Sequence, residues 1–214
     1  MFNRVELKQQ SWEQLRGKWE GGVLLGVIYM LICIGVSMLG FIPVLGRFAP
    51  ILITAPLVIG YMTAFVRFAR NNDRINFEDL FKGFNIYGKS LGIVLWVDLW
   101  VSLWSLLFVI PGIIKGLSYS MSCFIIADNP NVKVRDAMKI SMKMTEGHKL
   151  DIFIMGLSFI GWFLLGCLSA FIGFLWIHSY MATSFANMYL KLKEISIERG
   201  VCTEEMFNGT VSLT

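Results

Sequence analysis

Positively charged side chains are confined to a few segments of this chain, and long uncharged apolar segments separate them. Seventeen of the nineteen Lys and Arg residues lie in four patches: before Glu20, between Arg67 and Lys89, between Lys133 and Lys149, and after Leu190. The other two, Arg47 and Lys115, lie between patches. Because Lys and Arg are enriched in the cytoplasmic loops of membrane proteins, this alternation predicts six membrane crossings with both termini in the cytoplasm.

The uncharged segments have the length and composition of membrane-spanning helices. Hydrophobic residues make up 56% of the 214 residues and charged residues only 16%, which is too apolar for a soluble domain of this size. About 20 residues cross a bilayer as a helix, and the charge-free runs 21–46 and 152–190 contain 26 and 39 residues. The expected fold is therefore an all-α, polytopic membrane protein with six transmembrane helices, at about 21–43, 48–66, 90–110, 112–128, 151–170 and 173–191.

The segments outside the crossings complete the predicted topology. Residues 1–20 are expected to form a helix at the membrane surface, and residues 193–214 a cytoplasmic tail. The fourth crossing is short, because only 12 residues separate Lys115 from Asp128, so Lys115 has to extend toward the outer surface. A re-entrant segment is the alternative there. The expected location is a bacterial plasma membrane.

Three parts of the chain share one pattern. Each starts with a Gly beside a basic or His residue and later contains a Tyr, a few small or hydroxyl residues, and a Phe. The Gly residues are at positions 17, 88 and 147, and the Tyr–Phe segments are 61–65, 119–124 and 180–185. This pattern predicts three pseudo-repeated helical hairpins packed about a shared interior. The alternative, that Tyr, Ser and Thr are common near helix ends, remains open.

The polar segments between the hairpins have the periodicity of short amphipathic helices. Apolar residues recur on one face of 77–87, and Arg135, Lys139 and Lys143 form a basic stripe at a spacing of four. We expect these cytoplasmic helices to lie in the inner headgroup layer, with the apolar face in the lipid and the basic face toward anionic headgroups. The alternative role is only to anchor and orient the hairpins.

Asp98 is the one acidic residue well inside a predicted span. An intramembrane carboxylate is costly and by default indicates a function such as a proton or ion step. Such a step would use hydroxyl groups of the repeated motifs along a path: Tyr61, Tyr119 and Tyr180. The structural alternative is an Asp98 held by hydrogen bonds, with Ser102, Tyr61, Thr63, Ser120 and Ser122 as candidate partners.

Few other residues suggest chemistry. His178 lies near the outer ends of the last two spans, either as a ligand or pH-sensitive group or as a polar cap on a turn. The segment 128–131 could bind a metal, but turn chemistry explains the same residues. The four Cys residues have no metal-binding or disulfide spacing, and no nucleotide-binding or catalytic motif occurs. We expect no enzyme activity, no cofactor, no metal site and no nucleic-acid binding.

Several blocks resemble a bacterial integral membrane family catalogued as domain of unknown function 975. They are IPGIIKGLSYSM at 110–121, ADNP at 127–130, GHK at 147–149 and LSFIGW at 157–162. The resemblance extends from about Trp12 to Tyr189, although Ser179 stands where a Pro is expected before Tyr180. It implies a polytopic membrane protein without an assigned activity. A more remote similarity, to the membrane portion of some glycerophosphodiester phosphodiesterases, points to lipids but carries no catalytic residue.

The expected function is that of a non-enzymatic membrane protein. It would contact the lipid bilayer, anionic headgroups, and a membrane-protein partner or a second copy of itself. Suitable roles are envelope stress tolerance, immunity against membrane-active peptides, or support of an exporter. The alternative is a small transporter or channel in which Asp98 changes its protonation state.

Overall fold

The computed structural model describes residues 3–38, 45–168 and 173–210 and shows an all-helical protein. No β-strand occurs within these residues, which confirms the predicted all-α class. The long helices are α2 (Trp19–Met38), α3 (Leu45–Asn71), α5 (Tyr87–Leu107) and α11 (Phe174–Glu198). The shorter ones are α1 (Arg4–Leu15), the 3-10 helix η2 (Phe77–Phe81), α4 (Lys82–Asn85), α6 (Val109–Tyr119), α7 (Ser122–Asp128), α8 (Val134–Met144), α9 (Lys149–Leu157), α10 (Ile160–Leu168) and α12 (Glu204–Asn208).

Five helical segments in the described part of the chain are long and apolar enough to cross a membrane. They are Trp19–Met38, Pro50–Asn71, Tyr87–Leu106, Val109–Asp128 and Lys149–Cys167. Their positions agree with the first five predicted crossings. The sixth predicted crossing, 173–191, lies within α11, whose apolar sequence is interrupted by polar residues and which is not among the five. Six crossings therefore stay a prediction.

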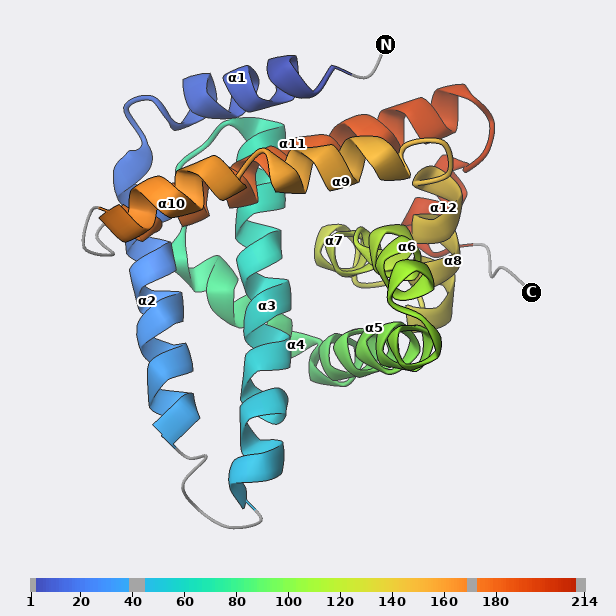
Figure 1. The fold of residues 1–214 in the computed structure, drawn as a ribbon, viewed down its shortest axis with the longest axis horizontal. Coiled ribbons are helices and arrows are strands. Elements are labelled where there is room, and N and C mark those ends of the chain that lie inside the picture. The colour runs from blue at the N-terminus through green and yellow to red at the C-terminus, as the bar shows by residue number, and fades with distance from the viewer. Residues whose placement is uncertain (1–2, 39–44, 169–172, 211–214) are drawn as a thin grey trace.

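Three helix pairs point in different directions from a common centre (Figure 1). α2 lies beside α3, α5 beside α6, and α10 beside α11, and α3 contacts both α7 and α11 at the centre. The outer part of the α5–α6 pair is largely bare of other protein, because only 11% of the segment Tyr87–Leu106 is buried and Leu106 is 84% exposed. The helix pairs thus pack together near α3, α7 and α11. They do not pack along their whole length, as the helices of a parallel bundle do. The hairpin repeat itself stays a prediction.

Two of the apolar segments are each divided by a short turn. α6 ends before α7 at residues 120–121, and α9 ends before α10 at residues 158–159. At both turns a Ser hydroxyl donates a hydrogen bond to a carbonyl oxygen three residues earlier. Ser120 bonds Leu117 at 2.8 Å, and Ser158 bonds Met155 at 2.6 Å. Such local bonds compete with the helical pattern and bend or interrupt a helix.

The segment after α3 folds back along that helix because two glycines let the backbones touch. A Cβ atom on Gly60 of α3 would lie 1.8 Å from the carbonyl oxygen of Leu80 in η2. A Cβ atom on Gly83 of α4 would lie 1.9 Å from the carbonyl oxygen of Pro56. No side chain larger than a hydrogen atom fits at either contact.

This returning segment replaces the single amphipathic helix that was expected over 77–87. It consists of η2 and α4, and Leu80 is buried against α3. The remaining residues of the predicted apolar stripe are exposed: Phe77, Phe81, Phe84 and Tyr87. Their exposure agrees with a surface in contact with lipid, although one stripe residue serves the protein core instead.

Both ends of the described chain pack onto the fold. The side-chain amide of Asn187 in α11 donates to Ser11 Oγ at 2.9 Å and to Gln14 Oε1 at 2.7 Å, which fixes α1 on α11. α12 lies against α8, and Cys202 and Phe207 are buried. The predicted tail 193–214 therefore begins as the last turns of α11 and then returns to the protein.

The backbone contact at Gly60 predicts a large effect of one methyl group. Gly60→Ala should lower the free energy of unfolding by about 1–3 kcal/mol, because α3 and η2 have to separate to admit the new atom. Thermal unfolding of the detergent-purified protein measures this loss. The matched control is Gly35→Ala in α2, where an added Cβ meets nothing within 4 Å. Equal unfolding temperatures for the two variants would contradict the contact.

Candidate functional site

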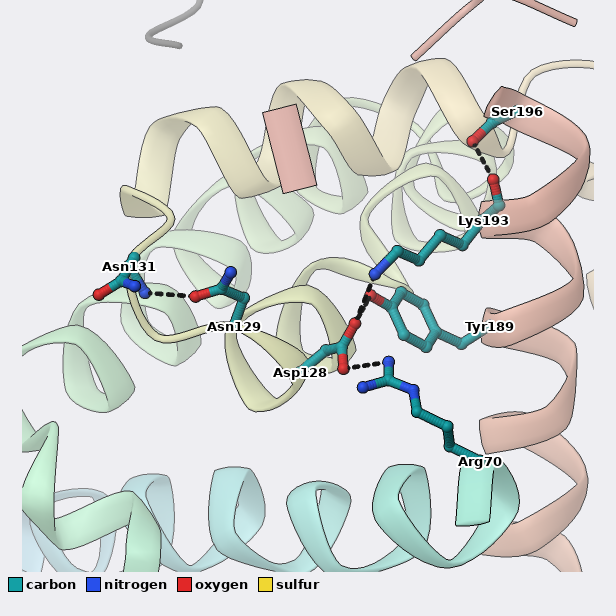
Figure 2. Close-up of polar contacts among 7 residues, drawn as sticks. All are labelled: Arg70, Asp128, Asn129, Asn131, Tyr189, Lys193 and Ser196. Carbon is teal, nitrogen blue, oxygen red and sulfur yellow. Dashed lines mark hydrogen bonds and ion pairs between the residues drawn. The ribbon is translucent and has the colours of Figure 1, made fainter. Parts of the chain in front are cut away.

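The carboxylate of Asp128, at the end of α7, is bonded by side chains of two other helices (Figure 2). Arg70 of α3 donates to Oδ1, and the Tyr189 hydroxyl and the Lys193 ammonium of α11 donate to Oδ2 at 2.9 and 2.8 Å. The side chain of Asp128 is only 5% exposed. A buried carboxylate needs such opposite charges and donors. We call these four residues the Asp128 cluster.

Three members of the Asp128 cluster occupy equivalent places in the repeated pattern. Each follows the Tyr of its segment by nine residues: Tyr61 to Arg70, Tyr119 to Asp128, and Tyr180 to Tyr189. The ends of α3 and α7 therefore meet the second half of α11. At these places a cation, Arg70, and a hydroxyl group, Tyr189, both donate to one anion, Asp128.

Two of the three Gly–basic positions also make equivalent contacts. The Lys18 ammonium donates to the backbone oxygen and, at 3.0 Å, to the Oδ1 atom of Asn72, just after α3. The Lys89 ammonium donates to the backbone oxygen of Pro130 at 2.5 Å, just after α7. Cations stabilise the carbonyl end of a helix. These contacts place both basic positions at the same end of the fold as the Asp128 cluster.

An apolar cavity of about 290 Å³ lies between α2, α3, α7 and α11. The Phe residues that end the three Tyr–Phe segments all line it: Phe65, Phe124 and Phe185. We call this cavity the Tyr61 pocket. Its other lining residues are Tyr29, Val58, Tyr61, Met62, His178, Met181 and Ala182.

The polar atoms of the Tyr61 pocket come from three side chains. The Tyr61 hydroxyl and His178 Nδ1 are 2.6 Å apart and share a hydrogen bond. The ring of Tyr29 lies 5.0 Å from the ring of Tyr61 and 6.2 Å from that of His178. His178 therefore lies inside α11, bonded to α3, and the interpretation of this residue as a polar cap on a turn is wrong.

The Asp128 cluster lies at one end of the Tyr61 pocket. The Phe124 ring, which lines the pocket, stacks on the Tyr189 ring with centroids 5.9 Å apart and planes 18° apart. Tyr189 in turn donates its hydroxyl hydrogen to Asp128. Phe124 thus connects the wall of the Tyr61 pocket, through Tyr189, to the ionic contacts of Asp128.

Asp98 is not part of this site. Its side chain is exposed on α5, it does not line the Tyr61 pocket, and it makes no hydrogen bond or ion pair with another residue in the described ranges. The thiol of Cys123 on α7 lies close enough to Asp98 to interact electrostatically with its carboxylate. Two of its candidate partners bond backbone oxygens instead, since Thr63 donates to Ile59 and Ala127, and Ser120 donates to Leu117.

The three repeated Tyr residues do not line one path. Tyr119 is buried, with its ring centroid 6.0 Å from the Lys115 ammonium. Tyr180 donates its hydroxyl hydrogen to the backbone oxygen of Lys8 at 3.3 Å, and the Lys8 ammonium lies 4.6 Å from the ring centroid of Phe159. Burial lowers the pKa of Lys8. Only Tyr61 of the three lines the Tyr61 pocket.

The basic stripe of α8 faces away from the protein. Arg135 and Lys143 are exposed and Lys139 is half-buried, whereas Ala137 and Ile140 on the other face are fully buried. The apolar face of α8 therefore packs on protein, mainly α7, and not on lipid as expected.

The residues around Asp128 combine a turn with the ionic contacts. Asn129 Oδ1 accepts a hydrogen bond from the backbone N–H of Asn131 at 3.0 Å (Figure 2), so the turn interpretation is confirmed for this pair. The ionic role of Asp128 was missed.

In the described residues no group of three His, Cys, Asp or Glu side chains could hold a metal ion. Burial raises the pKa of the Cys202 thiol, which disfavours the nucleophilic thiolate form.

A family model matches residues 1–115 and 106–196. The chain belongs to the family described as protein of unknown function (DUF975). This is the family that the sequence blocks resemble, and its description assigns no activity. No curated protein matches the chain, and no solved structure matches it either.

The Asp128 cluster predicts how this DUF975 protein responds to a minimal substitution. Asp128→Asn keeps the shape of the side chain but removes the negative charge opposite Arg70 and Lys193. The free energy of unfolding should fall by about 1–3 kcal/mol, because charged hydrogen bonds are lost at a buried group while both cations stay partly exposed. Thermal unfolding in detergent measures the loss. Asp73→Asn, at an exposed loop position, is the control and should change nothing.

Proposed function

We propose that this protein is a non-enzymatic, multi-pass protein of a bacterial plasma membrane that acts by binding anionic lipid headgroups and a membrane-protein partner or a second copy of itself. Both termini would lie in the cytoplasm. The observation that carries the proposal is the outward-facing basic stripe of α8, together with five described segments that are apolar enough to enter a bilayer.

The contact between α8 and α5 places the stripe beside an apolar segment. The Arg135 guanidinium lies 5.7 Å from the ring centroid of Trp96, which belongs to one of the five apolar segments. Arg side chains next to a bilayer extend toward the headgroups. With its apolar face buried in protein, α8 presents mainly its charged face, which attracts anionic lipid electrostatically.

A lipid- and partner-binding protein of this kind would serve envelope stress tolerance, immunity against membrane-active peptides, or support of an exporter. The exposed aromatic residues of the η2–α4 segment add an apolar surface for such contacts. The lack of an enzyme activity remains part of the proposal.

The transporter alternative has less support. It requires a polar cavity that reaches Asp98, but the Tyr61 pocket is lined by apolar and aromatic residues with His178, and Asp98 lies outside it. An exposed carboxylate on one helix face does not by itself form an ion path.

The proposed lipid contact predicts the effect of reversing three charges. A variant with Arg135, Lys139 and Lys143 replaced by Glu should retain several-fold less phosphatidylglycerol through purification, because each basic group near an anionic surface contributes about 1 kcal/mol. The phosphatidylglycerol that remains bound per protein is measured by mass spectrometry of the lipid extract, with phosphatidylcholine as the uncharged reference.

The matched control reverses three other charges, at Arg74, Lys191 and Arg199, and changes the net charge by the same amount. Lipid retention equal to that of the unmodified protein is expected for this control. An equal loss in both variants would mean that overall charge, and not the α8 stripe, attracts the lipid.

The position of Asp98 predicts that it carries no ion step. Asp98→Asn should leave proton and ion flux across proteoliposomes at the level of the unmodified protein, since no described residue forms a path with it. The flux is followed with a pH-sensitive dye inside the vesicles. A flux that the substitution abolishes would favour the transporter and count against the binding function.

A further inference from the structure

Two apolar pockets share the polar side chains of Tyr29 and His178. The Tyr61 pocket, of about 290 Å³, lies on one side of Tyr29 and His178. A second cavity of about 150 Å³ lies on the other side, and the same two residues line it together with Gly26, Met30, Cys33 and Leu175. Gly26 lies against the wall that these two residues form, since an added Cβ would make an ordinary contact with His178 Nδ1 at 3.9 Å.

The walls of the Tyr61 pocket restrict the charge of any ligand. No Lys, Arg, Asp or Glu lines it, and the rings of Phe124 and Tyr189 lie between it and the Asp128 cluster. A charged ligand group would lose its hydration without gaining an opposite charge. The pocket therefore suits a neutral molecule.

The size of the pocket restricts the number of apolar chains. Its volume lies at the lower end of ligand-binding pockets, which begin at about 300 Å³. Phe65, Phe124 and Phe185 approach from three helices and leave room for one aliphatic chain, whereas a two-chain phospholipid needs more space.

The polar wall supplies one hydrogen-bonding position. The Tyr61 hydroxyl already uses Nδ1 of His178, so the Nε2 atom is the ring nitrogen left to bond a ligand. Nε2 therefore makes one hydrogen bond, as donor or as acceptor according to the tautomer, and a ligand hydroxyl group can take either role. The Tyr29 hydroxyl is a further polar group on this wall.

We propose that the Tyr61 pocket binds one neutral, single-chain lipid of the monoacylglycerol or long-chain alcohol class. The hydroxyl group bonds His178, and the aliphatic chain packs against the three Phe residues. This site uses none of the basic stripe on α8, so a failure of the headgroup proposal leaves it standing.

The test is photolabelling of the purified protein with a monoacylglycerol that carries a diazirine on its acyl chain. Peptides of α3, α7 and α11 are expected to carry the label. Unlabelled monoacylglycerol should compete, and the corresponding alkane without a hydroxyl group should compete about fivefold less well, for the loss of one hydrogen bond. Competition by a two-chain phosphatidylglycerol or by the anionic fatty acid at equal concentration would overturn the proposal.

Two substitutions locate the label. Ala182→Phe fills the Tyr61 pocket and should reduce labelling of these helices at least tenfold, while Leu164→Phe, on the exposed face of α10, adds bulk elsewhere and should change nothing. Because Ala182→Phe could impair folding, His178→Phe is the second variant and keeps the ring while removing its nitrogens. It should reduce the preference for the monoacylglycerol over the alkane, while the Tyr61 and Tyr29 hydroxyls stay on the wall. Unchanged labelling in Ala182→Phe, or an unchanged preference in His178→Phe, would overturn the assignment.

Discussion

The carboxylate of Asp128 is a buried negative charge, and such a charge is tolerated only where cations and hydrogen-bond donors surround it. Arg70 of α3 and Tyr189 and Lys193 of α11 supply them. The ends of α3 and α7 therefore lie beside the second half of α11. The helix pairs run in different directions from this region (Figure 1), and the close backbone contact at Gly60 holds the following segment against α3.

The Tyr61 pocket is a consequence of the same convergence. Phe65, Phe124 and Phe185 lie four or five residues before the cluster positions of their helices, about one helical turn away. Where the ionic contacts of Asp128 bring α3, α7 and α11 together, these three rings line a cavity between the helices. A membrane interior gives apolar groups no reason to leave lipid, so polar contacts and close packing have to hold the helices together. Here the ionic contacts of Asp128 stabilise the packing of α3, α7 and α11, and apolar residues line the pocket between these helices.

Sequence reasoning predicted the parts of this fold that depend on local composition. Five of the six segments predicted to cross a membrane are helices of sufficient length and apolarity. The repeated Tyr–Phe pattern singled out residues that line one pocket or lie near one cluster. Tyr61 and His178 were both candidates, but their contact spans 117 positions, which no local pattern indicates. Asp98 was singled out because a carboxylate in a span is costly, yet the sequence does not say which helix face points outward. Asp128 was interpreted as a turn residue because its partners are distant, and Tyr29 was missed as one tyrosine in an apolar run.

The spacing of the Asp128 partners has a consequence for biosynthesis. Arg70 precedes Asp128 by 58 residues, whereas Lys193 follows it by 65. At about 5–20 residues per second, a ribosome needs roughly 3–13 seconds to supply the second cation. During that interval the nascent chain contains Asp128 with Arg70 but without Lys193. A translation product that stops early never acquires the second cation. The Asp128 contacts are therefore complete only once the last long helix has been synthesised.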